Sequence, residues 1–156
     1  GSHGLGSKVL PYEEGARVPL MILDPRVPES LRGRRTSALS GNIDITATIM
    51  DLAGIGHTHE MDGRSLMPMV RGKAKRVRDR LPLIQVWGTA GTLAMGVVTE
   101  QYKYIFWPYG EGIDPREELF DIQFDPYEMR NLAVMQENHP ALQSMKSHYN
   151  EESPKM

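Results

Sequence analysis

The chain has 156 residues, a formal net charge of −2, 24% charged residues and no cysteine. This length suits one domain, or one small domain with part of another. The near-neutral charge does not indicate a protein that binds nucleic acid or a membrane surface. The absence of cysteine excludes disulfides, thiolate zinc sites and cysteine nucleophiles, and no apolar run approaches the roughly 20 residues that would span a bilayer.

The first predicted elements are a loop and a strand. Residues 1–14 are rich in glycine and predict a loop, and the small, polar start does not resemble a signal peptide. The apolar run at residues 18–23 is closed by Asp24-Pro25. A run of this length between turn residues is typical of a strand that is buried on both faces, so we expect it to belong to a parallel sheet.

A surface loop and a helix are predicted next. Residues 27–37 are basic and rich in turn-forming residues, which indicates a loop. Asp44 is a natural N-cap for a helix that would stop at Gly54. The face that we expect this helix to bury carries Ile45, Ile49 and Leu52. A strand followed by a helix is the pattern of α/β folds.

The second half of the chain predicts an antiparallel sheet with a helix. Residues 83–87 form one apolar run, and the runs at 93–99 and 102–107 are separated by only two residues, which predicts a hairpin. Residues 118–122 predict a further strand. A terminal helix is expected at 141–149, with one apolar stripe made of Leu142, Met145 and Tyr149.

Four groups of residues follow one another in a set order along the chain. The first is Gly-Ser-His-Gly-Leu-Gly-Ser-Lys at 1–8, with Tyr-Glu-Glu-Gly-Ala-Arg-Val-Pro at 12–19. Residues 44–54 and residues 62–68, Asp-Gly-Arg-Ser-Leu-Met-Pro, are the second and third. The last comprises Tyr-Lys-Tyr-Ile at 102–105, Glu-Leu-Phe-Asp at 118–121 and Asp-Pro-Tyr-Glu at 125–128. In this order they resemble motifs of the sulfatase family, over nearly the whole chain.

The resemblance implies hydrolysis of sulfate esters by a formylglycine nucleophile, with calcium on the sulfate oxygens. In the family the formylglycine is made from Cys or Ser in Cys/Ser-x-Pro-Ser-Arg, a motif that does not occur in this sequence. The family's calcium ligands would lie before Gly1. We therefore expect the C-terminal portion of a sulfatase-like hydrolase, which binds no calcium itself and is inactive alone.

The resemblance implies a catalytic role for Lys8. This residue occupies the position of the family lysine that contacts the sulfate, where an ammonium group can stabilise charge on the sulfuryl and ester oxygens. His3 aligns with a family histidine and is a candidate substrate-binding residue, although Gly1-Ser2-His3 equally has the form of a cloning remnant. An anchoring role, rather than substrate contact, is expected of Tyr12, Glu13 and Arg17.

Some further features could bind other ligands. The histidines at residues 57–60 have no third spaced ligand, so no metal site is predicted there. The basic residues 73–80 are most simply a solvated linker. An aromatic core, rather than stacking on sugar rings, is expected of Trp87, Trp107 and Tyr109. If the linker and the aromatics did bind glycans, the chain would be a non-catalytic module for sulfated glycans, and this alternative stays open.

The predicted fold is α/β, in two parts. Residues 1–75 would be the tail of a sulfatase-type α/β catalytic domain, and residues 76–156 a small antiparallel β-sheet subdomain packed with a C-terminal helix. The parent enzyme would act on a sulfated small molecule or glycan, with a phosphonate or phosphodiester hydrolase of the same alkaline-phosphatase-like superfamily as the alternative. No nucleic acid or membrane partner is expected. The isolated chain could self-associate through its strand at 18–23, and the family suggests a periplasmic or secreted location.

Overall fold

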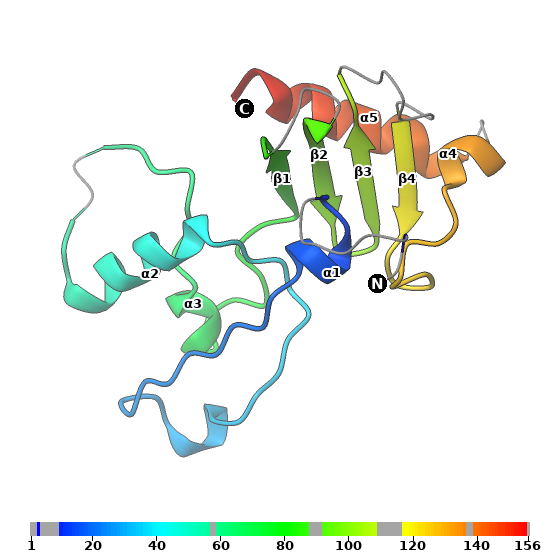
Figure 1. Ribbon diagram of the computed structural model, residues 1–156. Coiled ribbons are helices and arrows are strands. Elements are labelled where there is room, and N and C mark those ends of the chain that lie inside the picture. Colours follow the sequence, from blue (N-terminus) through cyan, green and yellow to red (C-terminus); the bar gives the residue numbers. More distant parts are fainter. Residues whose placement is uncertain are drawn as a thin grey trace. The chain divides into compact units, whose positions relative to one another are not determined.

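The computed structural model describes residues 3, 10–56, 59–87, 92–108, 117–136 and 139–155. They form two compact units, Gly1–Pro19 with Pro82–Met156 and Leu20–Leu81 (Figure 1). The start of the chain therefore groups with its second half. The domain boundary after residue 75 stays a prediction about the parent protein, whereas the compact units of this chain divide after Leu81.

The first unit is built on a four-stranded sheet whose strands lie in chain order (Figure 1). The strands are β1 Arg80–Gln85, which begins just before the division between the units, β2 Ala94–Thr99, β3 Tyr102–Phe106 and β4 Glu117–Asp121. β2 pairs with β3 and β3 with β4, both in antiparallel fashion, and Val98 lies opposite Lys103 across the two-residue turn. The predicted hairpin and antiparallel sheet are confirmed.

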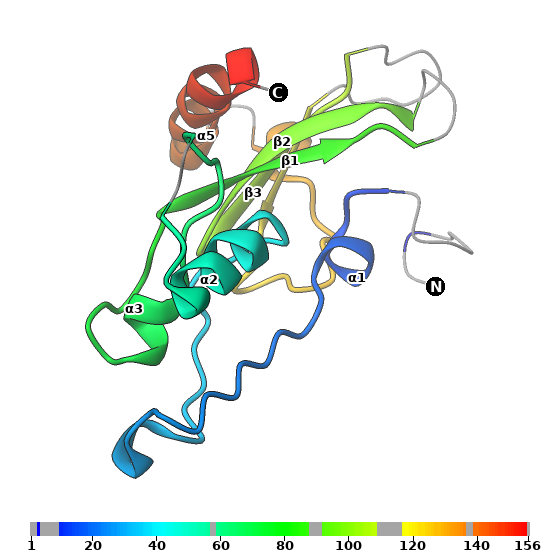
Figure 2. The same cartoon turned by 90° about the vertical axis from the view of Figure 1, so that its left-hand side faces the viewer.

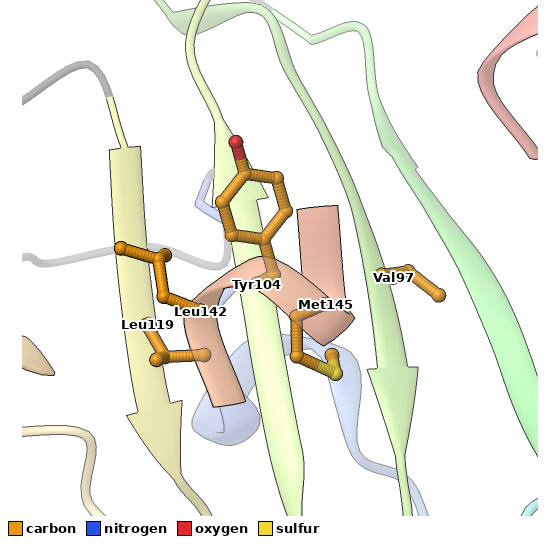
Figure 3. Packing of buried hydrophobic residues seen from close by; sticks show 5 residues of the cluster. All are labelled: Val97, Tyr104, Leu119, Leu142 and Met145. Atoms are coloured by element: carbon orange, nitrogen blue, oxygen red, sulfur yellow. The ribbon is translucent and has the colours of Figure 1, made fainter. Parts of the chain in front are cut away.

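One face of the sheet is covered by α5 Pro140–Glu152, the predicted C-terminal helix. The buried cluster on this face consists of Val97, Tyr104, Leu119, Leu142 and Met145 (Figure 3). The Tyr149 ring packs against the Tyr104 ring with centroids 5.5 Å apart. The predicted apolar stripe of this helix is thus the face that contacts the sheet.

The opposite face of the sheet carries a second apolar cluster, made of Ala94, Ile105, Trp107 and Phe120. Leu10 and Tyr12 pack against it, and the short helix α1 Glu13–Ala16 follows them. Figure 2 shows α1 and α5 on opposite sides of the sheet. Residues 13 and 14 were expected in a loop but open this helix, because their backbone groups continue the turn that begins at Tyr12.

The three aromatic residues for which a place in the core was expected have different outcomes. Trp107 is buried, as expected for a core residue. Trp87 is 72% exposed, so its predicted place in the core is wrong. The reason is that β1 ends at Gln85, so that Trp87 lies beyond the sheet. Tyr109 lies outside the described residues.

The second unit contains α2 Ile43–Ala53, which ends at Gly54 as predicted. Gly54 has φ +68°, a left-handed conformation that glycine adopts without steric cost. The N-cap prediction is wrong, because Asp44 lies inside the helix and Asn42 precedes it. The fully buried Asp44 carboxylate instead accepts hydrogen bonds from the Gly41 and Arg64 amides and pairs with Arg78.

The predicted buried face of α2 is also wrong. Ile45 and Ile49 are exposed and Leu52 is half-buried, whereas the buried residues of the helix are Asp44, Ala47 and Thr48. The Thr48 hydroxyl accepts a hydrogen bond from the Leu66 amide at 3.0 Å, and the Ser65 hydroxyl donates to Asp51. Hydrogen bonds to the loop at residues 62–68 therefore decide which face of α2 is covered, and hydrophobic periodicity does not report them.

Residues 18–23 do not form the predicted buried strand. Their backbone is in no strand, Met21 is 93% exposed and Leu23 is 91% exposed. A strand requires a neighbour that exchanges backbone hydrogen bonds with it. In the part of the chain that the structure describes, no strand pairs with this run, so its apolar side chains stay uncovered.

The remaining elements are short. They are η2 Glu29–Leu31, inside the predicted loop at 27–37, α3 Met67–Val70, α4 Leu132–Met135 and η4 Ser153–Lys155. None of the helices among the described residues is long and apolar enough to cross a bilayer.

Candidate functional site

A buried cluster of charged and aromatic side chains joins the start of the chain to the sheet of the first unit. We call it the anchor cluster, and its members are Tyr12, Glu13, Lys103, Glu118 and Glu128. Because side chains alternate along a strand, Lys103 of β3 and Glu118 of β4 point away from α5 and toward the N-terminal segment. Glu128 reaches the same place from the turn that follows β4.

Lys103 is the centre of the anchor cluster. Its side chain is 0% exposed, and its ammonium nitrogen lies 2.7 Å from Glu13 Oε1 and 2.7 Å from Glu128 Oε1. The same nitrogen donates to the Pro11 carbonyl oxygen at 3.1 Å. A charge taken out of water is tolerated only when it is paired and hydrogen-bonded. These three contacts fix residues 11–13 on the sheet.

The second part of the anchor cluster is centred on Glu118. The Tyr12 hydroxyl donates to Glu118 Oε1 at 3.0 Å, and the Trp107 indole N–H donates to Oε2 at 3.2 Å. Burial raises the pKa of the Glu118 carboxyl, and these two hydrogen bonds oppose the shift. Burial, with the Glu118 charge next, raises the pKa of the Tyr12 hydroxyl as well, so that Tyr12 keeps its proton and acts as a donor.

His3 lies against the anchor cluster. Its ring stacks on Tyr12 with centroids 3.9 Å apart and planes 3° from parallel, and its Nε2 atom lies 3.0 Å from the Tyr127 carbonyl oxygen. The histidine is half-buried. These contacts show where His3 is held, and its predicted contact with substrate stays a prediction. Lys8, the predicted sulfate contact, lies outside the described residues.

The anchoring role expected of the motif residues is confirmed for two of them. Tyr12 and Glu13 bind Glu118 and Lys103 in the interior, as described above. The Arg17 side chain is 70% exposed and only approaches Glu13, at 3.9 Å, which is a weak surface contact.

The carboxylates of this site do not form a metal centre. The described residues contain no group of three or more His, Cys, Asp or Glu side chains that could hold a metal ion. In the anchor cluster the positive charge is supplied by Lys103, which occupies the space between Glu13 and Glu128. The carboxylates of Glu13 and Glu128 are therefore paired with an ammonium group rather than gathered around a cation site.

Three members of the anchor cluster were not predicted as site residues. Lys103, Glu118 and Glu128 belong to the motifs that carry the family resemblance, but the sequence assigned them no role. A signal was present in β3, where Lys103 is the one charged residue among aromatic and aliphatic ones, whereas β4 begins with two glutamates and its composition does not single out Glu118. A polar residue in the middle of a strand that is covered on both faces must find a buried partner.

Comparison with known proteins identifies the family of the chain. A family model described as "N-sulphoglucosamine sulphohydrolase, C-terminal" matches residues 1–155. The chain belongs to the sulfatase family. The match covers nearly every residue and concerns the C-terminal region of these enzymes, as the order of the four motif groups suggested.

Individual sulfatases are also similar to the chain in sequence. The chain is 37% identical over 138 residues to a choline-sulfatase of Rhizobium meliloti, which covers 85% of this chain and 24% of that protein. It is 32% identical over 136 residues to arylsulfatase K of Gallus gallus, covering 81% of this chain and again 24% of the relative. The chain thus spans about a quarter of the length of these sulfatases.

A solved structure supports the fold. The structure of a protein in complex with its substrate, D-glucosamine-2-N,6-O-disulfate, matches 74% of this chain and 24% of its own chain, with a TM-score of 0.63 and 24% sequence identity. At this identity the similarity shows the fold of the sulfatase C-terminal region. The α/β class with a small antiparallel subdomain and a C-terminal helix is thereby confirmed.

Proposed function

We propose that this chain is the C-terminal part of an enzyme that hydrolyses a sulfate ester, and that it contributes Lys8 and His3 to the sulfate-binding site. The observation that carries the proposal is the way the anchor cluster holds the first motif. His3 stacks on Tyr12, and Tyr12 is in turn hydrogen-bonded to the buried Glu118. A histidine that is held in this way can present its ring to a ligand with little loss of entropy on binding.

The chemical part of this chain would be electrostatic. Cleavage of the bond between sulfur and the ester oxygen places negative charge on that oxygen and on the sulfuryl oxygens, and the leaving alcohol requires a proton. The Lys8 ammonium is suited to stabilise this charge. The nucleophile and the calcium ligands that the family resemblance implies would belong to the rest of the protein.

Relatives suggest the class of substrate. One similar protein is named a choline-sulfatase and another an N-acetylglucosamine-6-O-sulfatase, and a protein of the same fold has a structure in complex with a disulfated glucosamine. A small sulfated molecule or a sulfated sugar is therefore the proposed substrate. A periplasmic or secreted location, which would expose the enzyme to such molecules, belongs to the same proposal.

The test is turnover by the full-length protein that contains this chain. We expect hydrolysis of an aryl sulfate, with release of sulfate, and a loss of about 10²–10³-fold in kcat for Lys8→Ala. Arg17→Ala, which alters an exposed residue of the same motif, is the control and should retain its kcat. Faster hydrolysis of a phosphonate monoester or a phosphodiester than of every sulfate ester would favour the alternative hydrolase instead. A Lys8→Ala variant within twofold of the wild type would remove Lys8 from the site.

A further inference from the structure

A group of exposed basic side chains lies on the second unit, Leu20–Leu81. We call it the basic patch, and its members are Arg34, Arg35, Lys73 and Lys75. In the sequence of this unit lysine and arginine outnumber aspartate and glutamate, whereas acidic residues outnumber basic ones in the rest of the chain. Positive charge is therefore concentrated in one unit, although the net charge of the whole chain is −2.

The basic patch combines two segments that are far apart in the sequence. Arg34 and Arg35 follow the short helix η2, and Lys73 and Lys75 follow α3. The two segments meet at Gly72, where a Cβ atom would lie 3.4 Å from Arg34 Nη1. Gly72 has φ +70°, and the Gly72 and Lys73 amides donate to backbone carbonyl oxygens of α3 at 3.0 and 2.8 Å. The turn that carries Lys73 is therefore fixed beside the Arg34 guanidinium.

The other arginines of these two segments have partners within the unit. The Arg32 guanidinium donates to the Val27 and Pro25 carbonyl oxygens at 2.9 and 2.7 Å. Three further arginines form ion pairs at 2.8–3.2 Å, namely Arg26 with Asp24, Arg71 with Asp51 and Arg76 with Asp79. Among the residues that the structure describes, none forms a hydrogen bond or an ion pair with a side chain of the basic patch. The charges of the patch are therefore available to an anion from solution.

We propose that the basic patch binds a sulfated glycan chain through its sulfate groups. The choice of a sulfated ligand rests on the proposed function, whose substrate class includes sulfated sugars. The planar guanidinium group of arginine offers paired N–H donors to the oxygens of an oxyanion, and the two lysines add compact charges on flexible stems. Because several cations share one surface, a chain that carries several sulfates should bind much more tightly than a single sulfate ion.

Nucleic acid is the less suitable polyanion. Its phosphates repeat along an extended backbone, so that affinity depends on positive charge along much of the protein surface. The acidic balance of the sequence outside Leu20–Leu81 does not provide such a surface. A short sulfated chain requires only a local group of cations.

The test is the binding of a fluorescently labelled heparin octasaccharide to the full-length protein that contains this chain. We expect the wild type to bind, with an affinity that falls as sodium chloride rises, because salt screens contacts between exposed charges. Arg34→Glu with Lys73→Glu reverses two charges of the basic patch and should weaken binding about tenfold or more. Arg35→Glu with Lys75→Glu alters the other half of the patch and should act in the same direction. All four side chains are exposed, so both variants should fold.

The matched control is Arg17→Glu with Arg130→Glu. Both arginines are exposed and belong to the first unit, so this variant has the same net charge as each patch variant. It should bind the octasaccharide within about twofold of the wild type, because net charge alone acts weakly at physiological salt. Two control ligands are the same octasaccharide after chemical desulfation and a single-stranded DNA oligonucleotide. Both should bind more weakly than the sulfated chain.

The proposal is overturned if the wild-type protein does not bind the sulfated octasaccharide, or if both patch variants bind it as tightly as the wild type. Equal weakening in the control variant would assign the binding to net charge, and equal binding of the desulfated chain would remove the sulfate groups from it. Tighter binding of DNA would make nucleic acid the ligand, and each of these results also contradicts the proposal. The proposed function fails on a different result, the absence of sulfate ester hydrolysis by the wild type, and binding is measured without turnover.

Discussion

The Tyr12 hydroxyl donates a hydrogen bond of 3.0 Å to the Glu118 carboxylate, across 106 positions of the sequence. Burial raises the pKa of Glu118 above its usual value of 4.5. The folded state therefore keeps a proton at pH values where the unfolded chain has released it. By linkage, the contribution of Glu118 to stability is largest below pH 4.5 and falls as the pH rises through the raised pKa.

Glu118→Gln should remove this pH dependence. The amide cannot ionise, so the variant should not lose this stability, and its free energy of unfolding minus that of the wild type should become more positive as the pH rises from 4.5 to 7. Urea unfolding of the chain at several pH values in this range measures the difference. A difference that stays constant with pH would mean that Glu118 is not the titrating group.

Leu119→Ala should destabilise the first unit by about 2–5 kcal/mol. Leu119 is fully buried between the sheet and α5, so the truncation removes apolar contacts and leaves a cavity (Figure 3). Met129→Ala is the control, because Met129 is largely exposed, and it should change stability by less than about 0.5 kcal/mol. Urea unfolding followed by tryptophan fluorescence reports both variants, and equal effects would contradict the assigned core.

Gly63→Ala should disrupt the second unit. A Cβ atom at Gly63 would overlap the Ile43 carbonyl oxygen, so the loop at residues 62–68 could no longer lie against the start of α2. Overpacking of this kind typically costs about 1–3 kcal/mol. Gly56→Ala, where no atom lies within 4 Å, is the matched control and should be tolerated. Limited proteolysis within residues 20–81 would compare them, and equal cleavage rates would show that this close approach is not required.

The protection of backbone amides from hydrogen exchange should differ between segments of the isolated chain. We expect weak or concentration-dependent protection at residues 18–23, since these apolar residues are exposed and unpaired in the described structure. Firm protection is expected in β2, β3, β4 and α5, and at the Glu13 amide, which the anchor cluster holds. Uniform protection that does not depend on concentration would show that residues 18–23 are covered within one molecule.

The isolated chain should show no sulfatase turnover, with or without added calcium. Its sequence lacks Cys/Ser-x-Pro-Ser-Arg, the motif from which the family's formylglycine nucleophile is made. An aryl sulfate assay on purified chain provides the test. Activity that follows the protein through every purification step would refute the prediction.

The elements that sequence reasoning predicted correctly are those whose partners are close in the sequence. The hairpin of β2 and β3 is set by two adjacent runs and a two-residue turn, and α5 carries its own apolar stripe and needs only a flat apolar face. Gly54 ends α2 because its left-handed conformation is a local property of glycine. Such features can be read from a window of about ten residues.

The failures concern residues whose surroundings are made elsewhere. Ile45 and Ile49 form an apolar stripe, yet the polar face of α2 is the covered one, because Thr48 and Asp44 bind the loop that contains Arg64 and Leu66. The run at 18–23 has the composition of a strand but no described strand beside it. Composition states what a segment is able to form, and the available neighbours decide what it forms.

The anchor cluster could be anticipated only in part. The family motif around Tyr12 and Glu13 suggested an anchoring role, and the structure supplies the partners in Lys103, Glu118 and Glu128. A buried ion pair that joins residues 90 or more positions apart leaves no periodic trace in the sequence. The only trace is a charged residue in an apolar strand, which by itself does not identify its partner.

One compact unit is inserted in the sequence of the other, and this affects where a recombinant fragment of the protein can begin and end. Leu20–Leu81 is inserted between the two pieces of the first unit. A recombinant product that starts near residue 76 would contain the whole sheet and α5, but it would lack Pro11, Tyr12 and Glu13. The Lys103 ammonium would then lose two of its three ligands, and Trp107 and Phe120 would lose the cover that Leu10 and Tyr12 provide. A recombinant version of this unit would more reasonably keep residues 1–19 together with the chain from β1 onward, so that the excised segment is the middle of the chain rather than its beginning.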